Sequence, residues 1–213
     1  TKLEYRGYDS AGNAVFDGEK INVAKSVGRL AALKEKIKNN TPEGVMGIGH
    51  TRWATHGRPS DVNSHPHTDC SGKFAIVHNG IIENFMSLKE ELIAKGHKFV
   101  SEKATEVLAH LIEDVYEGDF VEAVNKVLNR IEGSYSLAFM CQDYPDTLIC
   151  TKKDNPLVIG LGEGENFIAS DIPAIIAYTR RTYIMNDGEI AVVKKDSIWV
   201  TDRKGNPGGA GVS

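Results

Sequence analysis

The stretches GHTRWATHG, residues 49–57, and VHNGIIEN, residues 77–84, lie on either side of a loop of about 20 residues. Each stretch overlaps or follows an apolar run, VMGIGH at 45–50 and FAIVH at 74–78, and such runs are typical of buried strands. Loops of this length within a compact domain usually have a function. We therefore expect two core strands whose ends carry a functional loop.

Strands, a block of helices and then many strands follow one another along the chain, which predicts an α+β domain with helices covering the outer faces of sheets. The apolar periodicity predicts a hairpin over 14–27, helices over 29–38, 83–95, 105–115 and 119–131, and short strands from Ser134 onward, with a brief helix over 173–178. We expect residues 1–205 to form one domain and residues 206–213 to be a flexible tail or a cloning remnant.

The composition excludes several classes of partner. The 213 residues carry a formal net charge of −4 without a long basic block, which argues against nucleic acid or anionic membrane as a partner. No apolar run approaches the roughly 20 residues that cross a bilayer, and the first residues do not read as a signal peptide. We expect a cytoplasmic protein with no nucleic acid and no membrane among its partners.

The three cysteines form no CxxC pair, so the sequence predicts neither a disulfide framework nor a zinc ribbon. Cys141 and Cys150 lie in apolar runs, where a thiol behaves as a small hydrophobic group. Cys70 lies in the polar stretch HTDCSG. We expect the first two to be buried and Cys70 to be exposed.

Four of the seven histidines lie between His50 and His67, which raises the question of a metal site. Asp61 and Asp69 are the only carboxylates nearby in the sequence, and the spacing matches no closed tetrahedral set. We therefore expect no metal and no other cofactor.

Arg52 offers a planar pair of donors to a carboxylate or phosphate, and Thr51 and Thr55 add hydroxyl donors from the same loop. This pattern predicts a pocket for a small acidic or zwitterionic ligand. The alternative is an arginine paired with a structural carboxylate. The density of polar groups at the end of an apolar strand favours the pocket.

Asn79 and Gly80 follow the apolar run FAIV, where we expect the strand to stop and the chain to turn. Asn-Gly is a strong turn signal, so a simple turn is one interpretation. The other is an oxyanion hole, because the asparagine amide is a donor and glycine lets a reacting oxygen approach the backbone. The residues alone leave both interpretations open.

Taken together, the motifs resemble the glutaminase domains of the glutamine:fructose-6-phosphate amidotransferases, which are class II glutamine amidotransferases. The resemblance runs in order along the chain to about Lys204 and includes LEYRGYDSAG at 3–12, GHTRWATHG, NSHPH at 63–67, VHNGIIEN, the SExxTE run at 101–106, EGSYSLA at 132–138, ASDIPA and DGEIAVV.

The resemblance implies an N-terminal-nucleophile hydrolase fold, which is a four-layer αββα sandwich. It also implies hydrolysis of the side-chain amide of L-glutamine by the thiol of an N-terminal cysteine, whose α-amino group is the general base. In this family the ammonia passes to a separate sugar-isomerase domain, which converts fructose 6-phosphate to glucosamine 6-phosphate.

The resemblance also implies roles for individual residues. Arg52 would bind the glutamine α-carboxylate, with Thr55 and His56 shaping that pocket, and Trp53 resembles the tryptophan that gates ammonia passage. Asn79 and Gly80 would form the oxyanion hole. His65 would have a structural or loop-ordering role.

The chain departs from the family pattern in two places. The family opens with a CGIVG-like strand, expected in the middle of a sheet, roughly twenty residues before LEYRGYDSAG, whereas this chain begins at Thr1, so we expect the chain as given to lack the nucleophile and to be inactive alone. The aspartate of SETDTE, which would bind the glutamine α-ammonium, is Ala104 here. Glu102 or Glu106 is a candidate replacement.

Three functions stay open. The first is the glutamine-hydrolysing domain of an amidotransferase, an enzyme. The second is a catalytically inactive ligand-binding or partner-docking module that keeps the Arg52 pocket. The third is a structural α+β domain with a solvated polar loop, which leaves HTRWATHG unexplained.

Overall fold

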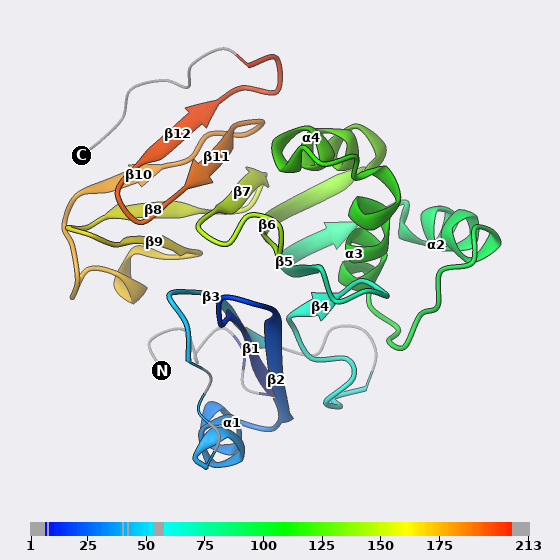
Figure 1. Cartoon of the computed structure of the whole chain (residues 1–213), viewed down its shortest axis with the longest axis horizontal. Helices are drawn as coiled ribbons and strands as arrows, with labels where there is room; N and C mark the ends of the chain where they lie inside the picture. The colour runs from blue at the N-terminus through cyan, green and yellow to red at the C-terminus, as the bar shows by residue number, and fades with distance from the viewer. Residues whose placement is uncertain (1–6, 8, 40, 42, 53–57, 206–213) are drawn as a thin grey trace.

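The elements of the protein stack in four layers, seen in the computed structural model (Figure 1). The structure describes residues 7, 9–39, 41, 43–52 and 58–205. Trp53, Thr55, His56 and the tail 206–213 lie outside the described residues, so the expectations for them remain predictions.

The largest layer is a six-stranded antiparallel sheet with the strand order β12-β11-β7-β6-β5-β4. Its long central strands β5 and β6 pair over nine residues each. The strands of this sheet are β4 (His67–Thr68), β5 (Phe74–Ile82), β6 (Gly133–Cys141), β7 (Leu148–Lys153), β11 (Ile190–Val193) and β12 (Ile198–Thr201).

Three helices cover one face of this sheet: α2 (Phe85–Ala94), α3 (Ala104–Val115) and α4 (Phe120–Arg130). Side chains alternate between the two faces of a strand, so Leu137 and Phe139 of β6 pack against the helices, whereas Ala138 and Met140 face the opposite way. Burying each large apolar side chain stabilises the domain by roughly 1.5–3 kcal/mol. This helix-facing core is the larger of the two main clusters of apolar residues.

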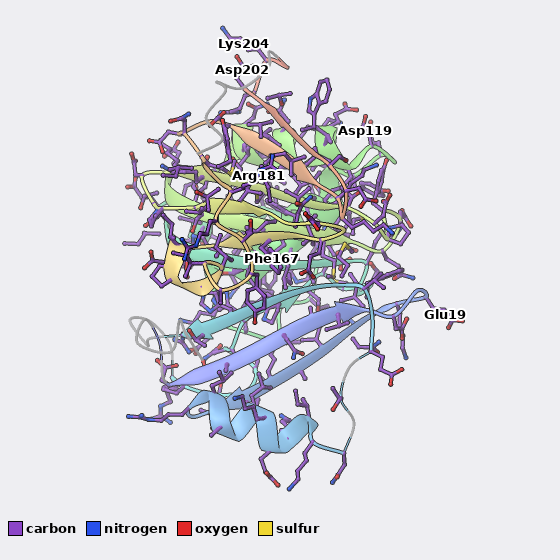
Figure 2. All side chains as sticks on the ribbon, turned by 90° about the vertical axis from the view of Figure 1, so that its left-hand side faces the viewer. Glu19, Asp119, Phe167, Arg181, Asp202 and Lys204 are labelled. Atoms are coloured by element: carbon purple, nitrogen blue, oxygen red, sulfur yellow. The ribbon has the colours of Figure 1, made fainter. Side chains whose placement is uncertain are left out.

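Two three-stranded sheets cover the other face, with the orders β2-β1-β3 and β10-β8-β9. Outside them lie α1 (Leu30–Ile37) and a 3₁₀ helix (Ile172–Ala174); Figure 2 shows α1 on the far side of the β2-β1-β3 sheet. The layers are therefore helix, sheet, sheet, helix, as expected. The strands are β1 (Ser10–Phe16), β2 (Ile21–Val27), β3 (Met46–Arg52), β8 (Val158–Leu161), β9 (Asn166–Ala169) and β10 (Thr182–Ile184).

The expected elements are confirmed with small shifts at their ends. The hairpin begins at Ser10 rather than Ala14, and the helix expected over 173–178 is the shorter 3₁₀ helix. Asp119 caps α4 by accepting a hydrogen bond from the backbone N–H of Glu122. Cys141 and Cys150 are buried and Cys70 is exposed, as predicted.

The expected turn at Asn79 and Gly80 is wrong. Both residues lie within β5, where Asn79 pairs with Ser136 and Gly80 with Tyr135 of β6. The strand continues to Ile82 because β6 offers backbone partners along its whole length. The local backbone preferences of an Asn-Gly pair favour a turn. Here the pairing with the neighbouring strand outweighed that preference.

In the described part of the chain, no helix is both long and apolar enough to span a membrane.

Candidate functional site

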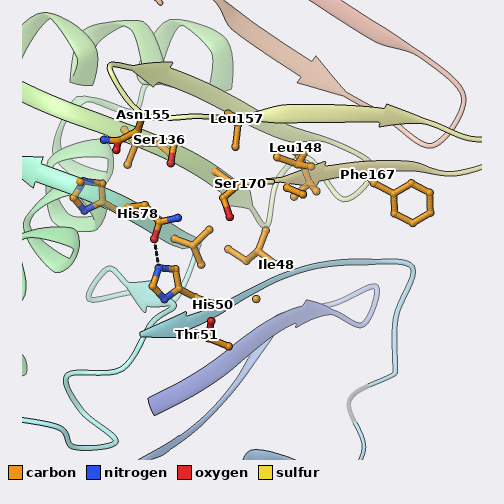
Figure 3. A pocket seen from close by; sticks show the side chains of 18 of the residues that line it. Ile48, His50, Thr51, His78, Ser136, Leu148, Asn155, Leu157, Phe167 and Ser170 are labelled. Carbon is orange, nitrogen blue, oxygen red and sulfur yellow. Dashed lines mark hydrogen bonds between the residues drawn. The ribbon is translucent and has the colours of Figure 1, made fainter. Parts of the chain in front are cut away.

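A cavity of about 490 Å³ lies where the two three-stranded sheets meet the six-stranded sheet (Figure 3). Its walls come from β3, from β5, β6 and β7, and from β9 with the residues that follow β7 and β9. In the described residues, β3 and β9 are each the edge strand of their sheet. Cavities of this size are typical of small-molecule sites.

His50 and Asn79 are joined across the cavity wall by a hydrogen bond, drawn in Figure 3. His50 Nε2 lies 2.7 Å from Asn79 Oδ1, and since a carbonyl oxygen only accepts, the histidine donates. This bond fixes the direction of the Asn79 side chain, with its amide nitrogen Nδ2 on the other side. Among the described residues, no other hydrogen bond engages that amide group. Asn79 therefore keeps two N–H donors for a ligand in the cavity.

Gly80 follows Asn79 with a φ of +117°, in the region that favours glycine. A Cβ at this position would lie 2.2 Å from the carbonyl oxygen of Ser134 and 2.5 Å from Asn155 Nδ2. Asn155 also lines the cavity, and its Nδ2 is buried with no hydrogen-bond partner among the described residues. Two side-chain amides and a bare backbone thus meet at one end of the cavity.

Four histidines are packed together at this wall: His50 and His78 line the cavity, and His65 and His67 lie next to them. The ring of His65 stacks on that of His50 with centroids 4.2 Å apart, and His67 meets His65 edge to face at 4.8 Å. Thr105 Oγ1 lies 3.5 Å from His65 Nε2 and 3.3 Å from His78 Nδ1. Burial is the main cause that lowers the pKa of all four rings, to about 3 for His78. These rings are neutral at pH 7, and His65 is buried between His50 and His67.

Arg52 ends β3 and is buried, but it lies outside the cavity lining, which includes its neighbour Thr51. Burial lowers the pKa of Arg52, and the charge of Asp9 opposes this shift. Lys103 is buried close by: its pKa is lowered to about 8, first by burial and then by the positive charge of Arg52. At the predicted anion pocket, the charges of Lys103 and Asp9 therefore act together with that of Arg52.

Neither glutamate suggested as a replacement for the aspartate at position 104 is well placed. Glu106 is buried and accepts hydrogen bonds from the backbone N–H groups of Val100 and Ser101, at 2.8 and 2.6 Å. Burial would raise its pKa, but hydrogen bonds from His110 and Ser101 outweigh it and lower the pKa to about 2. Glu106 is thus already engaged, and Glu102 is exposed.

The structure brings together part of the predicted site. Asn79 and Gly80 line the cavity, and Arg52 lies one residue beyond the lining of β3. The sequence motifs predict no role for Asp9 or Asn155, which lie 43 and 103 residues from Arg52. The signals for them in the sequence are weak: Asp9 lies inside the motif LEYRGYDSAG, and Asn155 stands before a strand.

Comparisons with known proteins point to one family. The model of the glutamine amidotransferase domain family matches residues 50–177, which is over half of the chain. A glutamine–fructose-6-phosphate aminotransferase (isomerizing) of Caldanaerobacter subterraneus subsp. tengcongensis is 57% identical over 95% of this chain and 33% of its own length. The protein of the same name from Thermococcus kodakarensis is 54% identical over 92% of this chain and 33% of its own. The chain thus spans about a third of the length of these curated relatives.

Solved structures agree with the fold. Glutamine phosphoribosylpyrophosphate amidotransferase from B. subtilis superposes with a TM-score of 0.78 at 27% identity, over 97% of this chain and 45% of that one. A glutamine aminotransferase class-II domain protein from Silicibacter pomeroyi superposes with a TM-score of 0.63 at 14% identity, over 91% of each chain, which shows a shared fold alone.

Proposed function

Because this chain belongs to the glutamine amidotransferase domain family and has the N-terminal-nucleophile hydrolase fold, we propose that the cavity between β3, β5 and β9 is its site of glutamine hydrolysis. The substrate is L-glutamine, and its side-chain amide lies against Asn79 and Gly80. The cavity is large enough for a ligand of this size.

The hydrogen bond between His50 and Asn79 is the observation that carries the proposal. Attack on the glutamine amide carbon creates a tetrahedral intermediate with a negatively charged oxygen. Donors already aimed at that oxygen stabilise it at no further cost of reorientation. The hydrogen bond from His50 holds Asn79 Nδ2 in place as such a donor. A side chain at position 80 would clash with its neighbours, so the backbone next to Asn79 stays bare.

Arg52 is proposed to bind the α-carboxylate, since its fixed fork of donors matches a carboxylate. Thr55 and His56 complete that pocket in the proposal, and Trp53 gates the passage of ammonia. These three roles rest on the resemblance of the motif GHTRWATHG.

The nucleophile in this proposal is the thiol of an N-terminal cysteine. It forms a thioester with the glutamine side chain and releases ammonia, and water then hydrolyses the thioester to glutamate. None of the three cysteines is among the residues that line the described cavity. The assay below therefore uses the natural full-length protein.

We propose that this protein, like the relatives of which it spans a third, supplies the ammonia to a sugar-isomerase domain that makes glucosamine 6-phosphate from fructose 6-phosphate. The cytoplasm is its proposed location, and three free cysteines suit a reducing compartment. Of the alternatives, an inactive binding module has no observation in its favour over the enzyme.

The decisive experiment removes the oriented donor. In the natural full-length protein, Asn79→Ala should lower kcat for glutamine hydrolysis by about 10²–10³-fold and change KM by less than about threefold, because the donor acts on the transition state. Release of glutamate and ammonia is measured with and without fructose 6-phosphate. Asn22→Ala, which removes an amide from β2 outside the cavity, is the matched control.

An unchanged kcat in the Asn79→Ala variant would refute the oxyanion assignment. If the wild-type protein binds glutamine in a calorimeter but releases no glutamate, the inactive binding module is the correct description.

A further inference from the structure

A second group of reactive side chains lies beside α3, and none of its members lines the cavity. Cys70 comes from the loop after β4, His97 from the turn after α2, and His110 and Glu113 from α3, one helical turn apart. Each offers one atom that can bind a metal, and these four atoms all lie within 4.8 Å of one another.

Four of the six distances between these atoms are close to those of a tetrahedral metal site. His97 Nδ1 and His110 Nδ1 are 3.2 Å apart, and Cys70 Sγ lies 3.4 Å from His110 Nδ1. Glu113 Oε2 is 3.6 Å from His97 Nδ1 and 3.7 Å from His110 Nδ1. Ligand atoms at the corners of a tetrahedron, each about 2.0–2.3 Å from a central zinc ion, are about 3.3–3.8 Å apart.

The ring of His110 is oriented for this role. Its Nε2 lies 3.2 Å from Glu106 Oε1, and since a carboxylate only accepts, Nε2 carries the proton. In the neutral ring, the lone pair is then on Nδ1, which faces Cys70 and His97. A carboxylate behind the second nitrogen of a histidine is the usual arrangement around bound metals. Glu106 is the positioning residue here, and His110 is 1% exposed.

His97 has a similar arrangement on its other nitrogen. Its Nε2 lies 3.7 Å from Asp114 Oδ1, so a proton on Nε2 faces a carboxylate and leaves Nδ1 for a ligand bond. The backbone N–H of His97 donates to the carbonyl oxygen of Leu92, which fixes the turn after α2. Glu113 Oε2 accepts a hydrogen bond of 3.2 Å from the backbone N–H of Cys70.

We propose that Cys70 Sγ, His97 Nδ1, His110 Nδ1 and Glu113 Oε2 bind a zinc ion. Sulfur, nitrogen and oxygen ligands in tetrahedral geometry suit Zn²⁺, and four protein ligands make a closed, structural site. On binding, the Cys70 thiol loses its proton to the solvent and the thiolate bonds to the metal. The ion then joins the β4–β5 loop, the α2–α3 connection and α3.

The expectation of no metal rests on the histidines between His50 and His67 and does not cover these four residues. They are spread over 44 positions, Cys70 to Glu113, without a recognisable zinc spacing, and the packing of α3 beside α2 and β4 brings them together. The competing description is a hydrogen-bonded cluster without metal, in which the Cys70 thiol donates to His110 Nδ1.

Binding of cobalt in place of zinc distinguishes the zinc site from the hydrogen-bonded cluster without metal. The natural full-length protein, free of tags, is treated with a chelator, dialysed, and titrated with Co²⁺ and then with Zn²⁺ in competition with a chromophoric chelator. The proposal expects one ion per chain, an intense visible spectrum of tetrahedral cobalt, and a thiolate-to-cobalt charge-transfer band that Zn²⁺ abolishes. Zinc should also raise the thermal midpoint, because only the folded state presents the site.

Cys70→Ser should remove the charge-transfer band, and both it and Glu113→Gln should weaken zinc binding by on the order of 10–100-fold. Glu90→Gln, which changes an exposed carboxylate on α2, is the matched control and should bind zinc like the wild type. Circular dichroism at each step shows that the variants are folded. Binding of less than one zinc ion per chain, or equal affinity in Cys70→Ser and wild type, would overturn the proposal and leave the hydrogen-bonded cluster.

Discussion

Ala104, the first residue of α3, is the position at which this chain departs most clearly from the motif it resembles. Its neighbour Lys103 is buried next to Arg52 and keeps its charge at pH 7, since its pKa is about 8. Two cations favour the α-carboxylate of an amino acid and repel its α-ammonium. Asp9, whose Oδ1 is buried with no hydrogen-bond partner among the described residues, is a carboxylate whose charge acts on both.

Ala104→Asp should strengthen glutamine binding by about tenfold, which corresponds to about 1.4 kcal/mol. A carboxylate there would offset the charge of Lys103 and is also favourable at a helix N-terminus. Isothermal titration calorimetry gives the affinity directly. Ala104→Asn, similar in size to the aspartate but uncharged, should bind glutamine like the wild type; equal gains in both variants would show that charge is not the cause.

At the residue scale, the sequence predicted the parts of the site that lie inside a motif. Asn79, Gly80 and Arg52 stand in such motifs, and the structure places the first two in the cavity and Arg52 directly beside it. Asn155 could not be predicted, because an isolated asparagine is most often a turn residue. Its contact with Gly80 depends on the pairing of distant strands.

At the scale of elements, β5 is the strand that turns the Asn79–Gly80 pair into part of a site. Ordinary residues avoid a φ of +117°, so glycine at position 80 lets the backbone adopt this conformation while its pairing with β6 continues. The helices were easier to predict, since Gly96 ends α2 and Asp119 begins α4 through local chemistry.

Gly80→Ala should lower the free energy of unfolding by at least about 2 kcal/mol, since strain at positive φ adds to a clash with the carbonyl oxygen of Ser134. Gly96→Ala is the matched control: its φ is +94°, but a Cβ there would meet nothing within 4 Å. It should cost about 1 kcal/mol. Urea unfolding measures the free energy of unfolding of both variants. Equal losses would mean that the backbone at Ser134 moves away from the new Cβ at no energetic cost.

At the scale of the whole molecule, the four buried histidines make stability depend on pH. Burial lowers the pKa of each ring in the folded state below the usual 6.5. The unfolded chain therefore takes up protons first as the pH falls below 6.5, and the stability that these rings contribute is present above that pH and lost below it.

When the pH falls from about 7 to about 5.5, each ring that stays neutral in the folded state should lower the free energy of unfolding by about 1 kcal/mol. His78, with a pKa of about 3, stays neutral throughout this range. Urea unfolding at both pH values tests this. The His78→Gln variant should lose about 1 kcal/mol less than the wild type over the same interval, and a wild-type stability that does not change with pH would contradict the assignment of buried neutral rings.

The sequence by itself determined the order and type of the elements, because apolar periodicity, helix caps and turn glycines act over a few residues. It also determined the family, through motifs that run in order along the chain. Only the tertiary structure decided that β5 continues through Gly80, that the charges of Asp9 and Lys103 act on Arg52, and that Cys70 meets His97 and His110. These contacts join segments far apart in the sequence, and only the packing of whole layers brings them together.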